Sequence, residues 1–339
     1  MAADQRLLRM AGWQGASRQR LKADASFRWY ERLTDGPRRA LMMHAPAPRE
    51  NLPAYLLVRR HLERLGLRVP RLLAADEDAG LALIEDFGDD TFTRLLDARR
   101  VDGAALYDLA VDVLIHLARA SAATDIDLPA YHMDALLDEV ALLPDWYVTH
   151  GLGRAVSPAL RRRYLDAWRA ALASVADRRE ALVLRDYHVD NLMIPHGVTL
   201  AAPAGRDVSA CGLLDFQDAR LGVAAYDLVS LVEDARRDVP DDVKERAIRR
   251  YLDALPGVDG AALRADMALL GAQRHAKVAG IFTRLSARDG KHHYLAHLPR
   301  VLRLLAAALD DPALAEVRGV MADLAPDLPA IAAPTSVSA

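Results

Sequence analysis

The chain has 339 residues, of which 52% are hydrophobic and 27% are charged, and its net charge is −3. This composition is that of an ordinary soluble globular protein, and the length suits two lobes or domains. The slight excess of acids argues against a nucleic-acid-binding protein, because such proteins gather many lysines and arginines on one face.

The single cysteine, Cys211, excludes an internal disulfide and suits a reducing compartment. The N-terminal stretch MAADQRLLRMAGW is amphipathic, unlike a secretory leader. No apolar run approaches the length that spans a bilayer. We therefore expect a cytoplasmic monomer with neither nucleic acid nor membrane as a partner.

The N-terminal third predicts a small, mostly β lobe. A short helix is expected over residues 4–12, and two strands on either side of the Asp35-Gly36 turn form a hairpin signal. Leucines at helical spacing then predict a helix from Glu50 to Gly66. A second strand pair, residues 70–76 and 81–86, ends this lobe near residue 87.

The remainder predicts a larger helical lobe. Helices are expected over residues 104–123, 132–143, 158–176 and from 226 to about 309. Residues 325–339 are rich in Pro, Ala and Ser and predict a poorly ordered tail. The sequence thus predicts an α+β protein with a small, mostly β N-terminal lobe (1–87), a larger helical lobe (88–324) and a tail (325–339).

Two short apolar runs, LVL and CGLL, each lead to an aspartate where regular structure stops, at Asp186 and Asp215. Pairing of residues 191–194 with 211–214 as a hairpin would bring Asn191 beside Asp215. Phosphoryl transfer needs oxygen ligands for Mg²⁺ and a separate carboxylate at the attacking hydroxyl. We therefore expect Asp186 to act as the catalytic residue, and Asn191 and Asp215 to hold the metal.

These residues resemble a known family. The protein-kinase pattern HRDxxxxN…DFG is matched in part, and the aminoglycoside phosphotransferase (choline-kinase-like) pattern HGDxHxxN…IDFxDAxxGxxxxDL fits better. The resemblance implies a bilobal protein-kinase-like fold. One departure is Leu184, where the pattern has its first His. The matching positions are Asp186, His188, Asn191, Asp215, Asp218, Gly222 and Asp227, the last expected to tie the catalytic loop by hydrogen bonds.

The sequence lacks the motifs by which kinases usually bind the phosphates of the nucleotide. A kinase fold covers the phosphates with a Gly-rich hairpin and supplies a Lys, but residues 23–27 contain no Gly and the second strand carries two methionines. We expect Ser26, Arg28 and Arg39 to bind the phosphates instead. The alternative that both arginines are exposed strand residues stays open. Glu85 and Phe87, at a hinge, are expected to contact the adenine.

Two helical stretches are candidates for the acceptor site. Trp146 lies in the stretch DWYVTHGLG, where a sugar ring could stack, although an interhelical turn with a buried Trp is an alternative. Arg274 and Lys277 suit an anionic acceptor or the phosphates if they point at the site, and are solvated charges if they point outward. Asp218 completes the expected acceptor contacts.

Over roughly residues 5–305, segments such as ADASFRWYERL, LRDYHVDNLM and QRHAKVAGIFTRL resemble the bacterial cell-wall sugar kinases. This resemblance implies transfer from Mg·ATP to the anomeric hydroxyl of N-acetylmuramate or N-acetylglucosamine. The products would be α-1-phosphates used in peptidoglycan recycling. The lactyl carboxylate of N-acetylmuramate would be complemented by the cations around Arg274.

Three alternatives stay open. An aminoglycoside kinase would need an acid-lined cleft for its polycationic substrate, and the cation-rich helices speak against one. A kinase for choline, homoserine or thiamine shares the core motif. A nucleotide-binding pseudokinase is suggested by the missing Lys, although it would have no need of Asp186, Asn191 and Asp215 together. A hydrolase has no support, because the sequence contains no G-x-S-x-G elbow.

Overall fold

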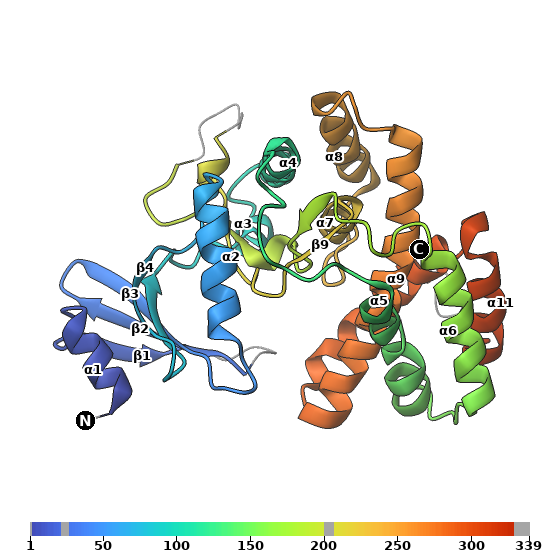
Figure 1. The fold of residues 1–339 in the computed structure, drawn as a ribbon, viewed down its shortest axis with the longest axis horizontal. Coiled ribbons are helices and arrows are strands. Elements are labelled where there is room, and N and C mark those ends of the chain that lie inside the picture. The colour runs from blue at the N-terminus through green and yellow to red at the C-terminus, as the bar shows by residue number, and fades with distance from the viewer. Residues whose placement is uncertain (1, 22–26, 200–206, 329–339) are drawn as a thin grey trace. The chain divides into compact units, whose positions relative to one another are not determined.

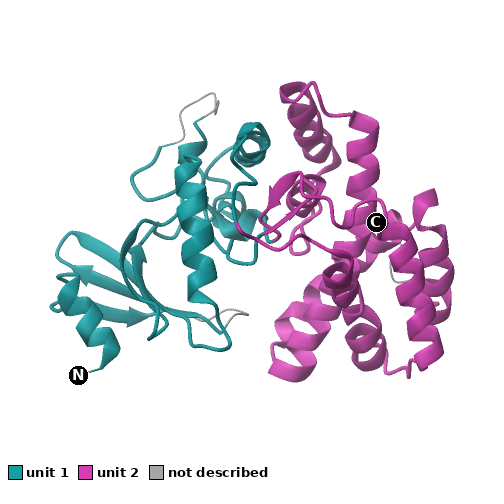
Figure 2. Cartoon of the chain, in the orientation of Figure 1, with its two compact units in different colours: residues 1–126, 186–219 teal, residues 127–185, 220–339 magenta. Residues whose placement is uncertain are grey.

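The computed structural model describes residues 2–21, 27–199 and 207–328 of the chain. They belong to two compact units, each built from two chain segments (Figures 1 and 2). Unit 1 comprises residues 1–126 and 186–219, and unit 2 comprises residues 127–185 and 220–339. The chain therefore passes from unit 2 to unit 1 between Arg185 and Asp186. Among the described helices, none is long and apolar enough to cross a membrane.

Unit 1 contains a five-stranded antiparallel sheet with the strand order β1-β2-β3-β5-β4 (Figure 1). Helix α1 (Ala3–Met10) packs on this sheet, where Leu7 and Leu8 share a core with Leu33 and Met42. The five strands are β1 (Ser17–Arg20), β2 (Trp29–Asp35), β3 (Arg38–His44), β4 (Leu72–Asp76) and β5 (Leu81–Glu85).

The β2–β3 hairpin confirms the prediction made from the Asp35-Gly36 dipeptide. Asp35 pairs with Arg38, so the loop has two residues, and Gly36 takes a positive φ of 58°. Glycine adopts this conformation without steric cost. Strand β1 was not predicted, because all four of its side chains are exposed and show no apolar alternation.

The rest of unit 1 carries the helices and a second, smaller hairpin. Helix α2 begins after Asn51, whose side chain accepts a hydrogen bond from the Ala54 N–H at 3.0 Å. The predicted pairing of residues 191–194 with 211–214 is confirmed by β7 and β8. The elements are α2 (Leu52–Arg64), α3 (Phe92–Asp97), α4 (Gly103–Arg119), η2 (Val189–Asn191), β7 (Leu192–Met193), η3 (Val208–Ala210) and β8 (Gly212–Leu213).

Unit 2 is mostly helical and is organised around the 30-residue helix α9 (Gly260–Asp289), which packs against α5, η1, α7 and α10. Strands β6 and β9 pair antiparallel within this unit. The other elements are α5 (Met133–Val140), η1 (Leu143–Gly151), α6 (Pro158–Leu172), β6 (Ala181–Val183), β9 (Arg220–Gly222), α7 (Ala225–Val232), α8 (Asp241–Ala254), η4 (His292–His297), α10 (Leu298–Ala308), η5 (Pro312–Leu314) and α11 (Ala315–Leu324).

Element η1 is a π-helix, so the alternative of an interhelical turn over these residues is wrong. Pro144, its second residue, has no N–H to give to the carbonyl of Val140, and that carbonyl accepts the Tyr164 hydroxyl at 3.0 Å instead. Gly280 of α9 lies against η1's start: a Cβ at this position would overlap the backbone carbonyl of Leu142. The close approach of the two backbones therefore requires glycine.

The α+β class and the division between a β-containing N-terminal part and a mostly helical C-terminal part are confirmed. The functional boundary expected after residue 87 stays a prediction. At the C-terminal end, Ala325 and Leu328 are buried, and residues 329–339 of the expected tail lie outside the described residues.

Candidate active site

The loop that carries the candidate catalytic Asp186 begins at the end of β6 in unit 2. The carboxylate of Asp227, in α7, accepts the backbone N–H of Leu184 at 2.6 Å and that of Arg185 at 2.8 Å. The Ser230 hydroxyl, also in α7, donates to the Arg185 carbonyl at 3.4 Å. The expectation that Asp227 ties this loop by hydrogen bonds is confirmed.

Within unit 1, Asn191 lies close to the loop backbone. Its side-chain amide donates to the carbonyl of Asp186 at 2.9 Å and is 3.4 Å from Nε2 of the buried His188. The Asn191 carbonyl accepts the N–H of Leu214 at 3.0 Å, next to Asp215. The β7–β8 hairpin thus brings Asn191 beside the residue before Asp215, as the sequence predicted.

Asp215 lies at the end of the second strand with a positive φ of 56° and a carboxylate that is 39% exposed. The next residue, Phe216, is buried and stacks on Tyr55 of α2, with ring centroids 5.1 Å apart. This packing fixes the backbone on one side of the carboxylate and leaves the other side accessible.

A divalent cation fits this carboxylate. Burial raises the pKa of Asp215, Arg28 opposes the shift, and the neighbouring Asp186 adds to it. A nearby cation would stabilise the ionised form. Mg²⁺ commonly takes one or two protein oxygens and completes its shell with phosphate and water. Among the described residues no group of three or more His, Cys, Asp or Glu could hold a metal ion.

Arg28 is the predicted phosphate ligand with the most defined surroundings. It is only 8% exposed and forms ion pairs with Glu50, at 3.1 Å, and with Asp215. It also donates to the Gln217 side chain at 2.7 Å. Although burial opposes it, the surrounding acidic groups raise the pKa of Arg28, so the guanidinium stays charged. A cation paired with a glutamate near a helix is the arrangement that kinases use with a Lys.

The other predicted phosphate ligands are less defined. Arg39 is an exposed residue of β3. Ser26 lies outside the described residues.

The two predicted adenine contacts, Glu85 and Phe87, are both held by neighbours. Glu85 forms ion pairs with Arg68 at 2.6 Å and with Arg71 at 3.2 Å, which hold its pKa below the ordinary value despite burial. Phe87 is buried, and its carbonyl accepts the N–H of His196 at 2.8 Å. Their role at the adenine stays a prediction.

Sequence reasoning missed Arg32, which holds this hinge segment to the sheet. Its guanidinium forms ion pairs with Asp86 at 2.7 Å and Asp89 at 3.1 Å, and it donates to the carbonyl of Gly88 at 3.2 Å. The available signal was an arginine within a predicted strand together with two acids around the Phe87-Gly88 dipeptide. Nothing in the sequence pairs these residues.

The four predicted acceptor residues divide between the units. Asp218, in unit 1, is exposed and accepts a hydrogen bond from Gln217 at 3.1 Å. Trp146, in η1 of unit 2, is partly buried and stacks on His150, with ring centroids 4.9 Å apart. Neither Arg274, 3% exposed, nor Lys277, 7% exposed, points into solvent, so the outward alternative is wrong for both.

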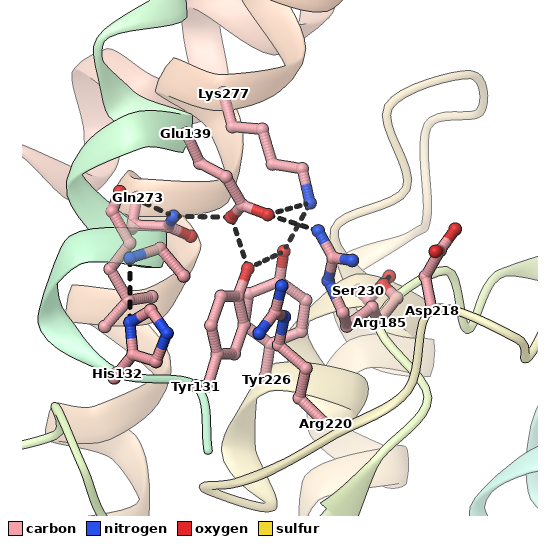
Figure 3. Close-up of polar contacts among 12 residues, drawn as sticks. Tyr131, His132, Glu139, Arg185, Asp218, Arg220, Tyr226, Ser230, Gln273 and Lys277 are labelled. Carbon is pink, nitrogen blue, oxygen red and sulfur yellow. Dashed lines mark hydrogen bonds and ion pairs between the residues drawn. The ribbon is translucent and has the colours of Figure 1, made fainter. Parts of the chain in front are cut away.

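Arg274 and Lys277 both have partners inside unit 2. Arg274 donates to the carbonyl of Glu233 at 3.4 Å. Lys277 forms an ion pair with Glu139 of α5 at 3.1 Å and donates to the Tyr226 hydroxyl at 3.3 Å (Figure 3). Both cations therefore stabilise the packing of α9 against its neighbours.

Glu139 is the centre of a largely buried polar cluster that no sequence pattern predicted (Figure 3). Its carboxylate contacts Arg185 and Lys277 as ion pairs and accepts hydrogen bonds from Tyr131 and, at 2.9 Å, from Gln273. Burial opposes ionisation, yet these cations and donors lower the pKa of Glu139 to about 2. The carboxylate is therefore ionised at neutral pH.

Arg185, which occupies the glycine position of the HGD pattern, takes a positive φ of 70°. Such a backbone suits glycine and costs other residues about 1–2 kcal/mol. The ion pair with Glu139, the hydrogen bond that the Arg185 N–H donates to Asp227 and the one that its carbonyl accepts from Ser230 hold Arg185 in this conformation. The residue before the candidate catalytic aspartate is thus fixed through both its backbone and its side chain.

A two-lobed α+β fold with an Asp, an Asn and a second Asp at strand ends defines the class of kinase-like phosphotransferases. A family model described as the phosphotransferase enzyme family matches residues 17–265, so the chain belongs to this family and is a phosphotransferase.

Comparison with known proteins supports the same class. The chain is 36% identical over 310 residues to a protein of Pseudomonas aeruginosa named N-acetylmuramate/N-acetylglucosamine kinase, with 89% of this chain and 87% of the relative covered. It is 34% identical to a protein of the same name in Caulobacter vibrioides, with 94% of each covered. A choline/ethanolamine kinase family protein from Mesorhizobium loti has a similar fold, with a TM-score of 0.61 at 15% identity and 93% and 95% coverage.

Proposed function

We propose that this chain phosphorylates the anomeric hydroxyl of N-acetylmuramate and N-acetylglucosamine, giving sugar α-1-phosphates from ATP. The observation that carries the proposal is the name shared by relatives that are 34–36% identical over most of their length. The described surroundings of Asp186, Asn191 and Asp215 support it, because a phosphotransferase needs all three.

In the proposed reaction the anomeric oxygen attacks the γ-phosphorus, the bond from that phosphorus to the ADP oxygen breaks, and Asp186 accepts the hydroxyl proton. An anomeric hydroxyl is more acidic than an ordinary alcohol, so one carboxylate can orient it and take its proton late in the transfer. The hydrogen bond from Asn191 to the Asp186 carbonyl and the tie from Asp227 to Arg185 support a fixed position for this carboxylate.

Asn191 and Asp215 are the residues that would hold Mg²⁺ in this proposal. The ion would supply positive charge at the phosphate oxygens. Arg28, which is already paired with Asp215 and Glu50, is the side chain best supported as a phosphate contact. Ser26 and Arg39 are proposed to assist it, with Glu85 and Phe87 at the adenine.

On the acceptor side, Trp146 is proposed as the surface for the sugar ring and Asp218 as a hydrogen-bonding partner of its hydroxyls. From the sequence, Arg274 and Lys277 are also proposed to bind the lactyl carboxylate of N-acetylmuramate. Their existing partners, the Glu233 carbonyl and the Glu139 carboxylate, would have to be exchanged or shared for that role. Peptidoglycan recycling in the cytoplasm is the proposed setting.

The decisive experiment is ³¹P NMR of the wild type and of Asp186→Asn, each incubated with Mg·ATP and either sugar. We expect a new sugar 1-phosphate signal from the wild type and its loss in the variant. No product with either sugar would overturn the proposed substrate, and a panel of amino alcohols and aminoglycosides would then identify the acceptor. A signal that persists in Asp186→Asn would overturn the role of Asp186.

A further inference from the structure

Arg284 lies on the same face of α9 as Lys277. Residues seven apart in an α-helix are on one side of it, and the rise between them is about 10 Å. Lys277 meets Glu139 of α5 and Tyr226 of α7. Arg284 therefore projects from the same side of the helix as the cluster that holds Arg185, two turns further along.

Unlike Lys277 and Arg288 of the same helix, Arg284 forms no ion pair with any residue that the structure describes. Its side chain is partly buried, and its Nε is fully buried without a hydrogen-bond partner. Within the described part of the chain it forms no hydrogen bond or ion pair. Arg274 and Lys277 are both engaged, and Arg288 is paired with Asp289 at 2.7 Å. A buried donor without an acceptor is costly, so this position favours a ligand that supplies one.

The electrostatic surroundings favour an anionic ligand. Burial and the nearby Arg288 both lower the pKa of Arg284, while Asp289 raises it. Arginine nevertheless remains protonated at neutral pH. The same desolvation and like-charge repulsion that disfavour the bare cation would be relieved by a carboxylate, which a guanidinium can bind through two parallel hydrogen bonds.

Element η1, which lies against this part of α9, carries an aromatic surface that suits a sugar ring. Thr283, the residue before Arg284, contacts η1: a Cβ on Gly151 would be 3.5 Å from the Thr283 methyl carbon. Element η1 presents the stacked rings of Trp146 and His150. Aromatic surfaces of this kind bind the apolar faces of rings, and π-helical segments are frequent at functional sites. Unit 2 thus places a partly buried cation next to a residue that lies against η1, the helix that carries the aromatic pair.

We propose that Arg284 binds the lactyl carboxylate of N-acetylmuramate and makes the enzyme prefer this sugar to N-acetylglucosamine. The inference rests on the proposed function. The two sugars differ in the lactyl ether at carbon 3, which adds one carboxylate to N-acetylmuramate. To distinguish the two sugars, the site needs one cation near the aromatic surface of η1 that is able to pair with this carboxylate. Arg284 is such a cation, whereas Arg274 and Lys277 already have partners.

Steady-state kinetics with both sugars test this assignment. For Arg284→Gln we expect kcat/KM with N-acetylmuramate to fall about 10- to 100-fold, as for a lost charge-assisted hydrogen bond. The value with N-acetylglucosamine should fall much less, because that sugar has no carboxylate. Arg284→Lys should recover part of the selectivity. Arg264→Gln is the matched control, since Arg264 lies on the same helix and pairs with Glu245 on an exposed surface at 2.8 Å.

A modified substrate gives a second, independent measurement. The carboxamide of N-acetylmuramate keeps the shape of the lactyl group without its charge. For the wild type, kcat/KM should be about 10- to 100-fold lower with the carboxamide than with the acid, whereas Arg284→Gln should show similar values for the two. This comparison can be made with the wild type even where the variant does not fold.

The outcomes separate the inference from the proposed function. If the wild type phosphorylates both sugars and Arg284→Gln leaves their ratio unchanged, the role of Arg284 is overturned while the sugar kinase stands. If the wild type phosphorylates the acid and the carboxamide equally well, the role of Arg284 is also overturned while the sugar kinase stands. A loss of selectivity in Arg274→Ala that Arg284→Gln does not show would move the carboxylate to Arg274. If neither sugar is phosphorylated, both proposals fall.

Discussion

Arg185 and Glu139, 46 residues apart in the sequence, form a partly buried ion pair at the residue that precedes Asp186. Arg185 has a left-handed backbone, and the ion pair holds its side chain to α5. A strained residue persists only where its surroundings determine it. We infer that the pair helps to keep the start of the catalytic loop in one conformation.

The first prediction concerns the backbone of Arg185. Arg185→Gly and Arg185→Ala both lose the ion pair, but only glycine adopts a φ of 70° without cost. We expect the glycine variant to be more stable to urea than the alanine variant by about 1–2 kcal/mol. It should also retain the higher kcat, with similar KM values for ATP. Equal stabilities would show that the left-handed conformation carries no cost in this protein.

The second prediction concerns the charge of Glu139. Glu139→Gln leaves the cations Arg185 and Lys277 partly buried without their carboxylate. We expect the free energy of unfolding to fall by about 3–5 kcal/mol. The control is Glu245→Gln, which removes one partner of an exposed ion pair with Arg264 and should cost at most about 1 kcal/mol. Similar losses in the two variants would contradict the importance of the buried cluster.

The third prediction is a loss of stability in acid. The folded protein lowers the pKa of Glu139 and of Glu233 from 4.5 to about 2. For Glu233, burial opposes ionisation, and the contacts with His275 and Lys244 outweigh it. A lowered pKa contributes stability that is present above the unfolded value and is lost as the pH falls toward the folded value.

Urea unfolding between pH 6 and pH 2 measures this effect. We expect stability to decline below about pH 5, by up to about 3 kcal/mol for each carboxylate, and to do so less steeply in Glu139→Gln. Parallel curves for the wild type and the variant over this range would show that Glu139 does not titrate with folding.

The fourth prediction separates the two arginines proposed for the phosphates. Arg28 is buried between Glu50 and Asp215, whereas Arg39 is exposed on β3. Arg28→Ala should raise the KM for ATP and lower kcat, each by about 10-fold or more, because charged hydrogen bonds are lost. Arg39→Ala should change both less than about 3-fold if it is an ordinary surface charge. A larger effect at Arg39 than at Arg28 would reverse the assignment.

The hairpin and the loop that carry the candidate catalytic residues could be predicted because their signals are local. Asp186 and Asn191 lie within one short loop, and the hairpin that brings Asn191 toward Asp215 is marked by two apolar runs. Asp227 was placed correctly as well, since a fixed spacing of twelve residues separates it from Asp215.

The surroundings of those residues could not be predicted, because they depend on contacts between distant segments. Glu139 is one acid on an amphipathic helix, and nothing local distinguishes it from an exposed one. The cations of α9 were recognised as a group, but their separate roles depend on which side of the helix each occupies and on what packs there. Strand β1 was missed because its exposed side chains give no periodic signal.

Gly280 has a consequence for the range of acceptors. Because any side chain at this position would collide with the backbone at Leu142, substitution must push η1 away from α9. In the proposed assignment these two helices carry Trp146 and Arg284, so one hydrogen atom in place of a methyl group sets the width of the sugar site. Gly280→Ala is accordingly the smallest change by which the chain would come to favour bulkier sugars.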